Sequence, residues 1–229
     1  GQIFRLDRDK ETELPRYYPV FIDVNKRRCV IIGGGNIGQE KVEKLLECDA
    51  DVFVISPEVN PHVEDLASSQ QISWDKREYQ QGDLEGAFIA IAATDDNTVN
   101  RQIAKEAEDR NVLLNVVDVT HLCTFIAPSV ARRGEVTIAT STGGASPALA
   151  RTFREKLTTS RILEYADLAP ILAQARAELV QRGVKVVPDH WQTQITDGLL
   201  NLVQSNKSDE AYKILMDGLL SEATPIPVS

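Results

Sequence analysis

The stretch VIIGGGNIG, residues 30–38, decides the fold that this sequence predicts. Gly33, Gly35 and Gly38 have the G-x-G-x-x-G spacing, directly after an apolar run and at the start of a helical pattern. In such a turn the first glycine permits the tight bend, the second lets the backbone approach a pyrophosphate, and the third lets helix and strand pack closely. The N–H groups at the helix start favour an anion. We therefore predict a dinucleotide-binding turn, the alternative being a tight turn that binds nothing.

Strands and helices alternate along the chain around this turn. We expect strands at 27–35, 51–56, 72–77, 87–94 and 112–118, and helices at 37–48, 61–69 and 96–110. Pro57 is expected to stop the strand at 51–56. The side chains expected on the inner face of the first helix are Ile37, Val42, Leu45 and Leu46. This alternation predicts an α/β fold with a Rossmann-like, doubly wound parallel sheet.

The pattern changes after residue 118. Two short apolar runs flank an Arg-Arg-Gly turn and predict a hairpin. Helical segments follow at 147–157, 161–182, 189–204 and 209–220. Pro170 is expected to kink the second of these or to mark its boundary. We therefore divide the chain into a flexible arm (1–16), an NAD-binding Rossmann-like domain (17–123), a small β-rich segment (124–157) and a helical domain (158–229).

The composition argues against a protein that acts mainly on nucleic acid. The 229 residues carry a formal net charge of −9, so no overall positive field attracts phosphate backbones. The three cysteines show no C-x-x-C pairing, and no cluster of His and Cys predicts a permanent metal site. No apolar run approaches the ~18–20 residues that span a bilayer. Because no signal peptide is visible either, we expect a cytoplasmic protein without a membrane partner.

The second predicted strand lacks the acidic residue that usually binds the ribose hydroxyls of NAD. The strand ends at Ser56, followed by Pro57 and Glu58, and no arginine follows closely enough to indicate a 2′-phosphate pocket. NAD is therefore favoured as the cofactor, and NADP stays open. Thr94, after the strand at 87–94, is a candidate for the far side of the cofactor. One of the two aspartates that follow it is expected to cap the next helix.

A second glycine-rich turn lies in residues 138–157, IATSTGGASPALARTFREKL. The hydroxyl and glycine residues that lead into its helix are Ser141, Thr142, Gly143 and Gly144. Basic residues outnumber acidic ones here, an unusual excess in an acidic chain. Hydroxyls, N–H groups and arginines such as Arg132 and Arg151 suit carboxylates or phosphates. A capped helix with a solvated basic face is the equal alternative.

Asp118 ends the strand at 112–118, at the carboxyl edge of the predicted sheet. A carboxylate at this edge could take a proton while a bound nicotinamide takes a hydride. His121 could share the proton transfer or coordinate a metal, although a surface histidine without such a role is the favoured alternative. Asp118 and His121 are therefore candidates for a transient metal site only.

Three stretches, in this order, resemble a known family. They are YYPVFIDVNKRRCVIIGGGNIGQEKVEKLL (17–46), AFIAIAATDDNTVN (87–100) and NVVD…CTFIAPSVARRGEVTIATSTGGASPALAR (115–151). They are similar to the precorrin-2 dehydrogenase/sirohydrochlorin ferrochelatase family, which also forms the amino-terminal half of siroheme synthase. The resemblance runs from Tyr17 to Lys156.

This resemblance implies an NAD-dependent oxidation of precorrin-2, a reduced tetrapyrrole, to sirohydrochlorin. In many members ferrous iron is then inserted to give siroheme. The resemblance also implies a homodimer joined through 124–157, a catalytic role for Asp118 in both activities, and a second glycine turn that faces the eight carboxylates of the substrate. The family's cofactor residues correspond to Gly33, Gly35, Asn36, Ile37, Ser56, Pro57 and Glu58.

Alternatives to the bifunctional enzyme stay open. Some relatives only oxidise, and a separate enzyme inserts the metal. A protein that senses NAD without chemistry would need the first glycine turn, but neither Asp118 nor STGGASPALAR. Thr142 stands where some relatives carry a serine that is phosphorylated, so this regulation is not expected. No methyltransferase domain follows TPIPVS, so we do not expect the chain to make precorrin-2 itself.

Overall fold

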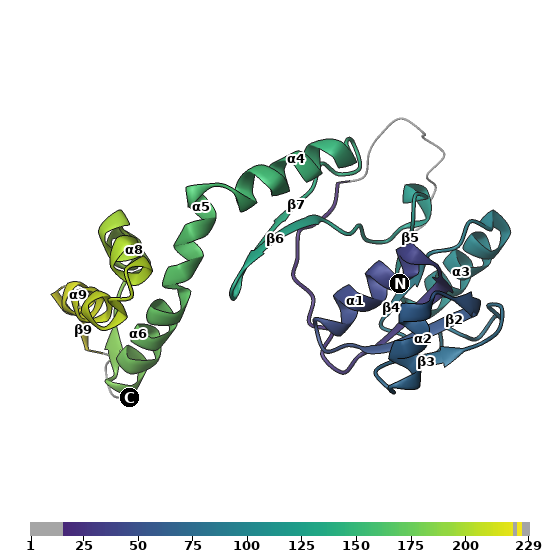
Figure 1. Cartoon of the computed structure of the whole chain (residues 1–229), viewed down its shortest axis with the longest axis horizontal. Coiled ribbons are helices and arrows are strands. Elements are labelled where there is room, and N and C mark those ends of the chain that lie inside the picture. Colours follow the sequence, from purple (N-terminus) through teal and green to yellow (C-terminus); the bar gives the residue numbers. More distant parts are fainter. Residues whose placement is uncertain (1–15, 222–223, 226–229) are drawn as a thin grey trace, which may run out of the picture. The chain divides into compact units, whose positions relative to one another are not determined.

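The computed structural model describes residues 16–221 and 224–225, which form two compact units (Figure 1). Within these ranges the first unit contains 16–127 with Gly143–Ala145, and the second contains Pro128–Thr142 and the remainder from Ser146. The predicted flexible arm lies outside the described residues, apart from Arg16. Each unit has its own apolar core and is described by itself.

The first unit is built on a five-stranded sheet with the strand order β3-β2-β1-β4-β5. Each pair of neighbouring strands is parallel. The strands are β1 (Arg28–Gly34), β2 (Asp51–Val59), β3 (Ser73–Asp75), β4 (Ile89–Ala92) and β5 (Leu113–Val116). The strand β1 is central, as its uninterrupted apolar run predicts. The predicted Rossmann-like α/β fold is confirmed.

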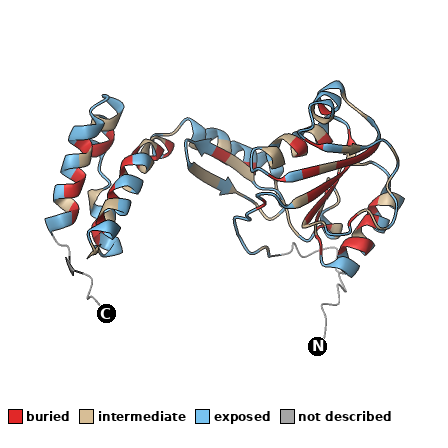
Figure 2. Cartoon of the chain, turned by 90° about the horizontal axis from the view of Figure 1, so that it is seen from below, coloured by how far each residue is buried: buried red, intermediate tan, exposed pale blue. Residues whose placement is uncertain are grey.

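Helices cover both faces of this sheet. They are α1 (Asn36–Leu46), α2 (Pro61–Ser68) and α3 (Asn97–Arg110), and a short 3-10 helix, η1 (Thr120–Leu122), follows β5. Successive residues of β1 point to opposite faces. Val30 belongs to the core that includes Ile103 of α3, whereas Ile31 belongs to the core that includes Val42 of α1 and Val63 of α2. Figure 2 shows the buried residues gathered along the strands between these helices.

One boundary prediction is wrong, because β2 continues through Pro57 to Val59. The pairing of β2 with β1 shifts at this point: Ile32 lies opposite Ile55, but Gly34 lies opposite Val59. Proline has no N–H to donate to a strand ladder, and it is tolerated where a bulge interrupts the ladder. The irregular register therefore lets the strand pass the proline and extend toward the carboxyl edge.

The second unit begins with the predicted hairpin, β6 (Ser129–Arg133) and β7 (Val136–Thr140), whose strands pair antiparallel. The helix α4 (Pro147–Thr158) packs against the hairpin, and Thr140 Oγ1 donates a hydrogen bond of 3.3 Å to the Ala150 carbonyl oxygen. The later elements are α5 (Arg161–Glu164), η2 (Tyr165–Leu168), α6 (Ala169–Gln181), β8 (Val184–Lys185), α7 (Pro188–Gln194), α8 (Asp197–Gln204), α9 (Ser208–Ser221) and β9 (Thr224–Pro225).

The helices α6, α8 and α9 share the core of the second unit. Pro170 is the second residue of α6, where its missing N–H would be unpaired in any helix, so it marks a boundary as predicted. The single helix expected at 189–204 is instead two helices, α7 and α8. Thr196 is extended between them, and its Oγ1 accepts a hydrogen bond of 3.2 Å from the Leu199 N–H, which starts α8.

Candidate functional site

The glycine turn has the geometry that its spacing predicts. Gly33 has φ of +110°, and a Cβ at this residue would lie 2.3 Å from the Ala93 carbonyl oxygen. A Cβ at Gly38 would lie 2.2 Å from the Gly33 carbonyl oxygen. Gly35 differs, because a Cβ there would meet nothing within 4 Å. Gly33 and Gly38 are therefore required by packing within the protein, whereas Gly35 leaves open space beside the turn.

The start of α1 is suited to an anion. Gly35 is its N-cap and supplies no side chain, and no acidic residue lies in the first turn. The other two α-helices in the described part of this unit are capped by side chains, α2 by Asn60 and α3 by Asp96. Uncapped N–H groups and the positive end of the helix dipole attract negative charge. The turn thus fits the pyrophosphate of a dinucleotide.

A cavity of about 140 Å³ lies at the same carboxyl edge of the sheet. It is lined by three of the residues predicted for the site: Ile37 from α1, Thr94 after β4 and Asp118 after β5. The expectation that Ile37 faces the core is wrong, since its side chain is 46% exposed at the beginning of the helix. These residues are distant in sequence, and the parallel strands bring them to one place.

Asp118 has an unusual backbone, with φ of +60°. The flanking N–H groups fix this conformation, because Val117 N donates to the Ala92 carbonyl oxygen at 3.0 Å and Val119 N donates to that of Val116 at 3.2 Å. A residue other than glycine in the left-handed region stores strain, and Asp tolerates it better than most residues. The turn leaves Asp118 exposed at the edge of the cavity.

Sequence reasoning missed Asn100, which also lines this cavity. Its side chain is 1% exposed, and its Nδ2 donates a hydrogen bond of 3.0 Å to the Thr94 carbonyl oxygen. Its Oδ1 is buried and has no hydrogen-bond partner in the structure. A buried acceptor without a donor costs about 1–3 kcal/mol, so Oδ1 suits a ligand with an N–H or O–H group. An asparagine inside a helical pattern would have been the only sequence signal.

The strand-end residues predicted for the ribose divide into buried and exposed ones. Ser56 is buried, and its Oγ donates a hydrogen bond of 2.5 Å to the Glu58 carbonyl oxygen. Trp74 Nε1 donates a hydrogen bond of 2.9 Å to the Ser56 carbonyl oxygen. Ser56 therefore shapes the end of β2, while Pro57 and Glu58 are exposed at that end.

The aspartates after Thr94 have separate positions. The carboxylate of Asp96 accepts hydrogen bonds from the N–H groups of Thr98 and Val99, at 2.7 and 3.2 Å, and so caps α3 as predicted. Asp95 lines the cavity. Capping thus accounts for Asp96, and the cavity has Asp95 and Asp118 as its acidic residues.

The second glycine turn is closed by its own hydrogen bonds. Thr142 Oγ1 accepts from the Ser146 N–H and donates to the Ser146 carbonyl oxygen, both at 3.0 Å. Gly143 and Gly144 have φ of +65° and +93°, and Ser146 Oγ accepts from the Leu149 N–H at 3.2 Å, as predicted for the N-cap of α4. The turn is thus a preformed loop before a helix.

The arginines predicted for the substrate differ in their partners. Arg151 donates a hydrogen bond of 2.7 Å from Nε to Glu155, which lowers the pKa of this glutamate. Arg132 lies on β6 and is exposed. The neighbouring Arg133 instead binds both carboxylate oxygens of Asp167, at 2.7 and 2.6 Å, and so ties the hairpin to η2. Arg133 therefore has a structural role, and the role of Arg132 in substrate binding stays a prediction.

The described residues contain no group of three or more His, Cys, Asp or Glu side chains placed to hold a metal ion. His121 lies in η1 and is exposed.

Within the described ranges, no helix combines the length and apolar character needed to cross a bilayer.

Known proteins resemble this chain in sequence over the same region. Residues 20–129 match the family of NAD(P)-binding domains, which supports the cofactor class predicted from the glycine turn. The siroheme synthase of Photobacterium profundum is 39% identical over 165 residues, which are 72% of this chain and 35% of that protein. The resemblance predicted from the motifs is confirmed.

Two further comparisons define how far the similarity extends. The siroheme synthase of Psychromonas ingrahamii is 34% identical over 212 residues, which are 91% of this chain and 45% of that protein. The chain thus spans less than half the length of these relatives. A solved structure, SirC, precorrin-2 dehydrogenase, superposes with a TM-score of 0.70 at 23% identity, and the match covers 88% of this chain and all of that one. The two proteins therefore share a fold.

Proposed function

We propose that this chain oxidises precorrin-2 to sirohydrochlorin with NAD, as a step of siroheme biosynthesis. The observation that carries the proposal is the position of Asp118, in one cavity with Ile37 at the start of α1 and Thr94 after β4. The names of the sequence relatives and of the structural neighbour support the choice of substrate. A protein that only senses a nucleotide would not need a carboxylate at this position.

The residues of the carboxyl edge fit the cofactor. Gly35 leaves open space, and the N–H groups of Asn36, Ile37 and Gly38 at the start of α1 would hold the pyrophosphate. The buried Oδ1 of Asn100 would accept a hydrogen bond from an amide or hydroxyl of the cofactor. Bound NAD supplies a hydride acceptor.

The chain itself supplies the proton acceptor. When the tetrapyrrole loses a hydride, a carboxylate oxygen of Asp118, or a water that Asp118 orients, accepts the proton that leaves with it. The two electrons leave with the hydride, so the substrate is oxidised and the proton stays on the protein or passes to water. The exposed position of Asp118 lets the proton escape to solvent.

The second glycine turn is proposed to bind carboxylates of the substrate. N–H groups of a loop with left-handed glycines and the hydroxyl of Ser141 suit oxyanions, as do the guanidinium groups of Arg132 and Arg151. A substrate with eight carboxylates offers many such contacts. These residues would orient the macrocycle rather than react with it.

Insertion of ferrous iron, the substrate of a second activity, is proposed for the same carboxylate. Asp118 would deliver the ion transiently or assist removal of pyrrole protons, with His121 as a second transient ligand.

We also propose a homodimer formed through residues 124–157. In α4 the side chains of Leu149 and Phe153, one helical turn apart, are 45% and 46% exposed, which supports an interface there.

The substitution Asp118→Asn tests the oxidation. Asn tolerates the left-handed backbone but accepts no proton, so we expect kcat to fall about 10²–10⁴-fold with the affinity for NAD unchanged. NADH absorbance and the macrocycle spectrum are followed anaerobically after precorrin-2 and NAD are added. Full turnover by the variant would remove Asp118 from the mechanism, and no turnover by the unchanged chain would favour a nucleotide sensor. Ferrous iron is added afterwards. A change of the macrocycle spectrum that depends on the protein would indicate a chelatase, and no such change would indicate a dehydrogenase without chelatase activity.

A further inference from the structure

The amino-terminal edge of the sheet holds a second cavity, of about 570 Å³. Three arginines line it: Arg27 just before β1, Arg28 as the first residue of β1, and Arg110 at the end of α3. Phe88, which precedes β4, also lines it. The glycine turn and Asp118 lie at the opposite ends of the same parallel strands, so this cavity is separate from the proposed cofactor site.

Arg28 is held by packing rather than by a carboxylate. Its guanidinium carbon lies 3.7 Å from the centre of the Phe53 ring. Its Nε is buried and has no hydrogen-bond partner, and among the described residues no carboxylate forms an ion pair with it. A buried charged donor without an acceptor is costly, unless a ligand supplies the acceptor.

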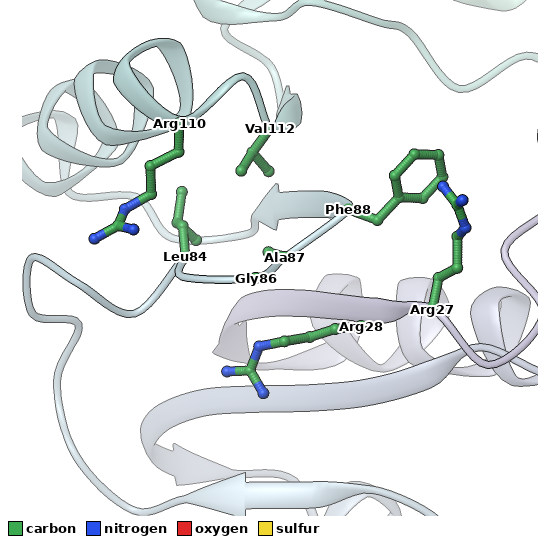
Figure 3. Close-up of a pocket in the computed structure, with 8 residues that line it drawn as sticks. All are labelled: Arg27, Arg28, Leu84, Gly86, Ala87, Phe88, Arg110 and Val112. Atoms are coloured by element: carbon green, nitrogen blue, oxygen red, sulfur yellow. The ribbon is translucent and has the colours of Figure 1, made fainter.

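The other two arginines complete a basic surface. Figure 3 shows the side chains of Arg28 and Arg110 extending to the same side of the cavity, while Arg27 turns over Phe88. The guanidinium carbon of Arg27 is 3.9 Å from the centre of the Phe88 ring. Guanidinium groups stacked on rings keep their N–H edges available for planar oxyanions.

The nearby carboxylates are occupied by other partners. Glu106, 3% exposed, accepts Arg110 Nε at 2.8 Å and also the Tyr79 hydroxyl and two backbone N–H groups. Both carboxylate oxygens of Asp83 accept hydrogen bonds of 2.8 Å from Arg77. Of the three lining arginines only Arg110 forms an ion pair in the described part of the chain, while the charge of Arg28 acts on Asp83 from further away and helps to lower the pKa of that carboxyl. A chain with net charge −9 thus places two arginines at one cavity that form no ion pair with the described carboxylates.

The floor of the cavity leaves room for a ligand at the backbone. Gly86 has φ of +69°, and a Cβ there would meet nothing within 4 Å. A glycine at such a position permits close approach of a bound group. Guanidinium groups suit oxyanions, and the glycine backbone leaves room for them.

We propose that this cavity binds a small polyanion that carries phosphate or carboxylate groups, with Arg27 and Arg28 as its main charge partners. The site goes beyond the proposed function and does not depend on it. Binding there would leave the carboxyl edge of the sheet open to the cofactor.

Calorimetric titration of the full chain with pyrophosphate, and separately with citrate, at low salt tests this proposal. Binding of either anion is expected, and Arg28→Gln should weaken it about tenfold or more, because a charge-assisted hydrogen bond is lost. Arg101→Gln removes an exposed charge of the same unit outside the cavity and should leave binding unchanged. Gly35→Asp blocks the glycine turn, which also fits a pyrophosphate, so the pyrophosphate binding that this variant keeps belongs to the cavity, and its citrate binding should be unchanged.

Specific results would overturn the proposal. These are no binding of either anion, equal losses in Arg28→Gln and Arg101→Gln, or loss in Gly35→Asp only, which would place the anion at the glycine turn. If Arg28→Gln does not fold, Arg27→Gln replaces it, because Arg27 is exposed and its removal leaves the core intact. Unchanged affinity of that variant would equally reject the site.

Discussion

At the scale of single residues, a substitution at Gly35 should weaken cofactor binding without lowering the stability of the fold. An Asp at this N-cap would meet no atom of the protein and would accept hydrogen bonds from the N–H groups that α1 leaves uncapped. The carboxylate would then occupy the place proposed for the pyrophosphate, with like charge. We therefore expect Gly35→Asp to lower the affinity for NAD about a hundredfold or more while the melting temperature is kept or slightly raised.

Isothermal titration and thermal denaturation of the same sample check this prediction. Gly35→Ala is the matched control, because it adds a side chain at the same place without charge and should cost less affinity. Normal binding of NAD by Gly35→Asp would show that the cofactor does not use this turn.

The buried thiol of Cys29 leads us to predict that the free energy of unfolding depends on pH. Burial, with a smaller contribution from the Asp51 carboxylate, raises the pKa of its thiol from 9.0 to about 11. The folded chain thus keeps a proton that the unfolded chain loses, so the stabilisation is complete below pH 9 and is lost as the pH rises toward 11. The loss should reach about 2–3 kcal/mol. Burial and the hydrogen bond to Glu106 also raise the pKa of Tyr79, which acts in the same direction.

Denaturant unfolding between pH 8 and pH 11 measures this loss. Cys29→Ala removes the titrating group, so its free energy of unfolding should fall less steeply with pH, whatever its value at pH 8. Cys48→Ala, at an exposed cysteine, should keep the original slope. Identical slopes in the two variants would contradict the assignment.

Single-residue predictions succeeded where the backbone imposes the residue type. The spacing of Gly33 and Gly38 anticipated contacts under 2.5 Å that no side chain could accommodate. The sequence offered no comparable signal for Asn100, because its role depends on the Thr94 carbonyl oxygen, which tertiary structure brings within hydrogen-bond distance. The roles of the predicted site residues in binding and catalysis stay predictions.

At the scale of elements, one substitution should have opposite effects in two helices. A Cβ at Gly38 of α1 would meet the backbone of β1, whereas a Cβ at Gly218 of α9 would lie 2.1 Å from Oε1 of Gln194, the end of a flexible side chain. Alanine favours a helix over glycine by about 0.5–1 kcal/mol. We therefore expect Gly218→Ala to raise the melting temperature and Gly38→Ala to lower it.

Calorimetric unfolding of both variants measures these shifts. Destabilisation by Gly218→Ala would show that Gln194 cannot move, in which case Gln194→Ala together with Gly218→Ala should restore stability. A Gly38→Ala variant as stable as the unchanged chain would contradict the close packing of α1 on β1.

Element types were predictable, but two boundaries were not. Apolar runs identified the strands β1, β2, β4 and β5 of the main sheet, because burial on both faces requires such runs, whereas the edge strand β3 is largely exposed. The end of β2 depends on its register with β1, which a local reading of Pro57 cannot show. The break between α7 and α8 depends on the hydroxyl of Thr196, a residue that also occurs inside helices.

At the scale of the whole molecule, the proposed homodimer gives a prediction about mass. Phe153 on α4 is 46% exposed, so replacing it with aspartate leaves no cavity in the protomer but places a charge in the proposed interface. We expect Phe153→Asp to convert a dimer into a folded monomer. Ile214→Asp, on α9 and with a starting exposure of 51%, should leave the dimer intact.

Light scattering after size exclusion, at several protein concentrations, distinguishes the outcomes. We expect the unchanged chain and Ile214→Asp to be dimers and Phe153→Asp to be a monomer. The two side chains are similarly exposed, but only Phe153 lies in the proposed interface. A monomer in the unchanged chain at every concentration would reject the homodimer, and a dimer in Phe153→Asp would move its interface away from α4. Circular dichroism of each variant separates loss of the interface from loss of the fold.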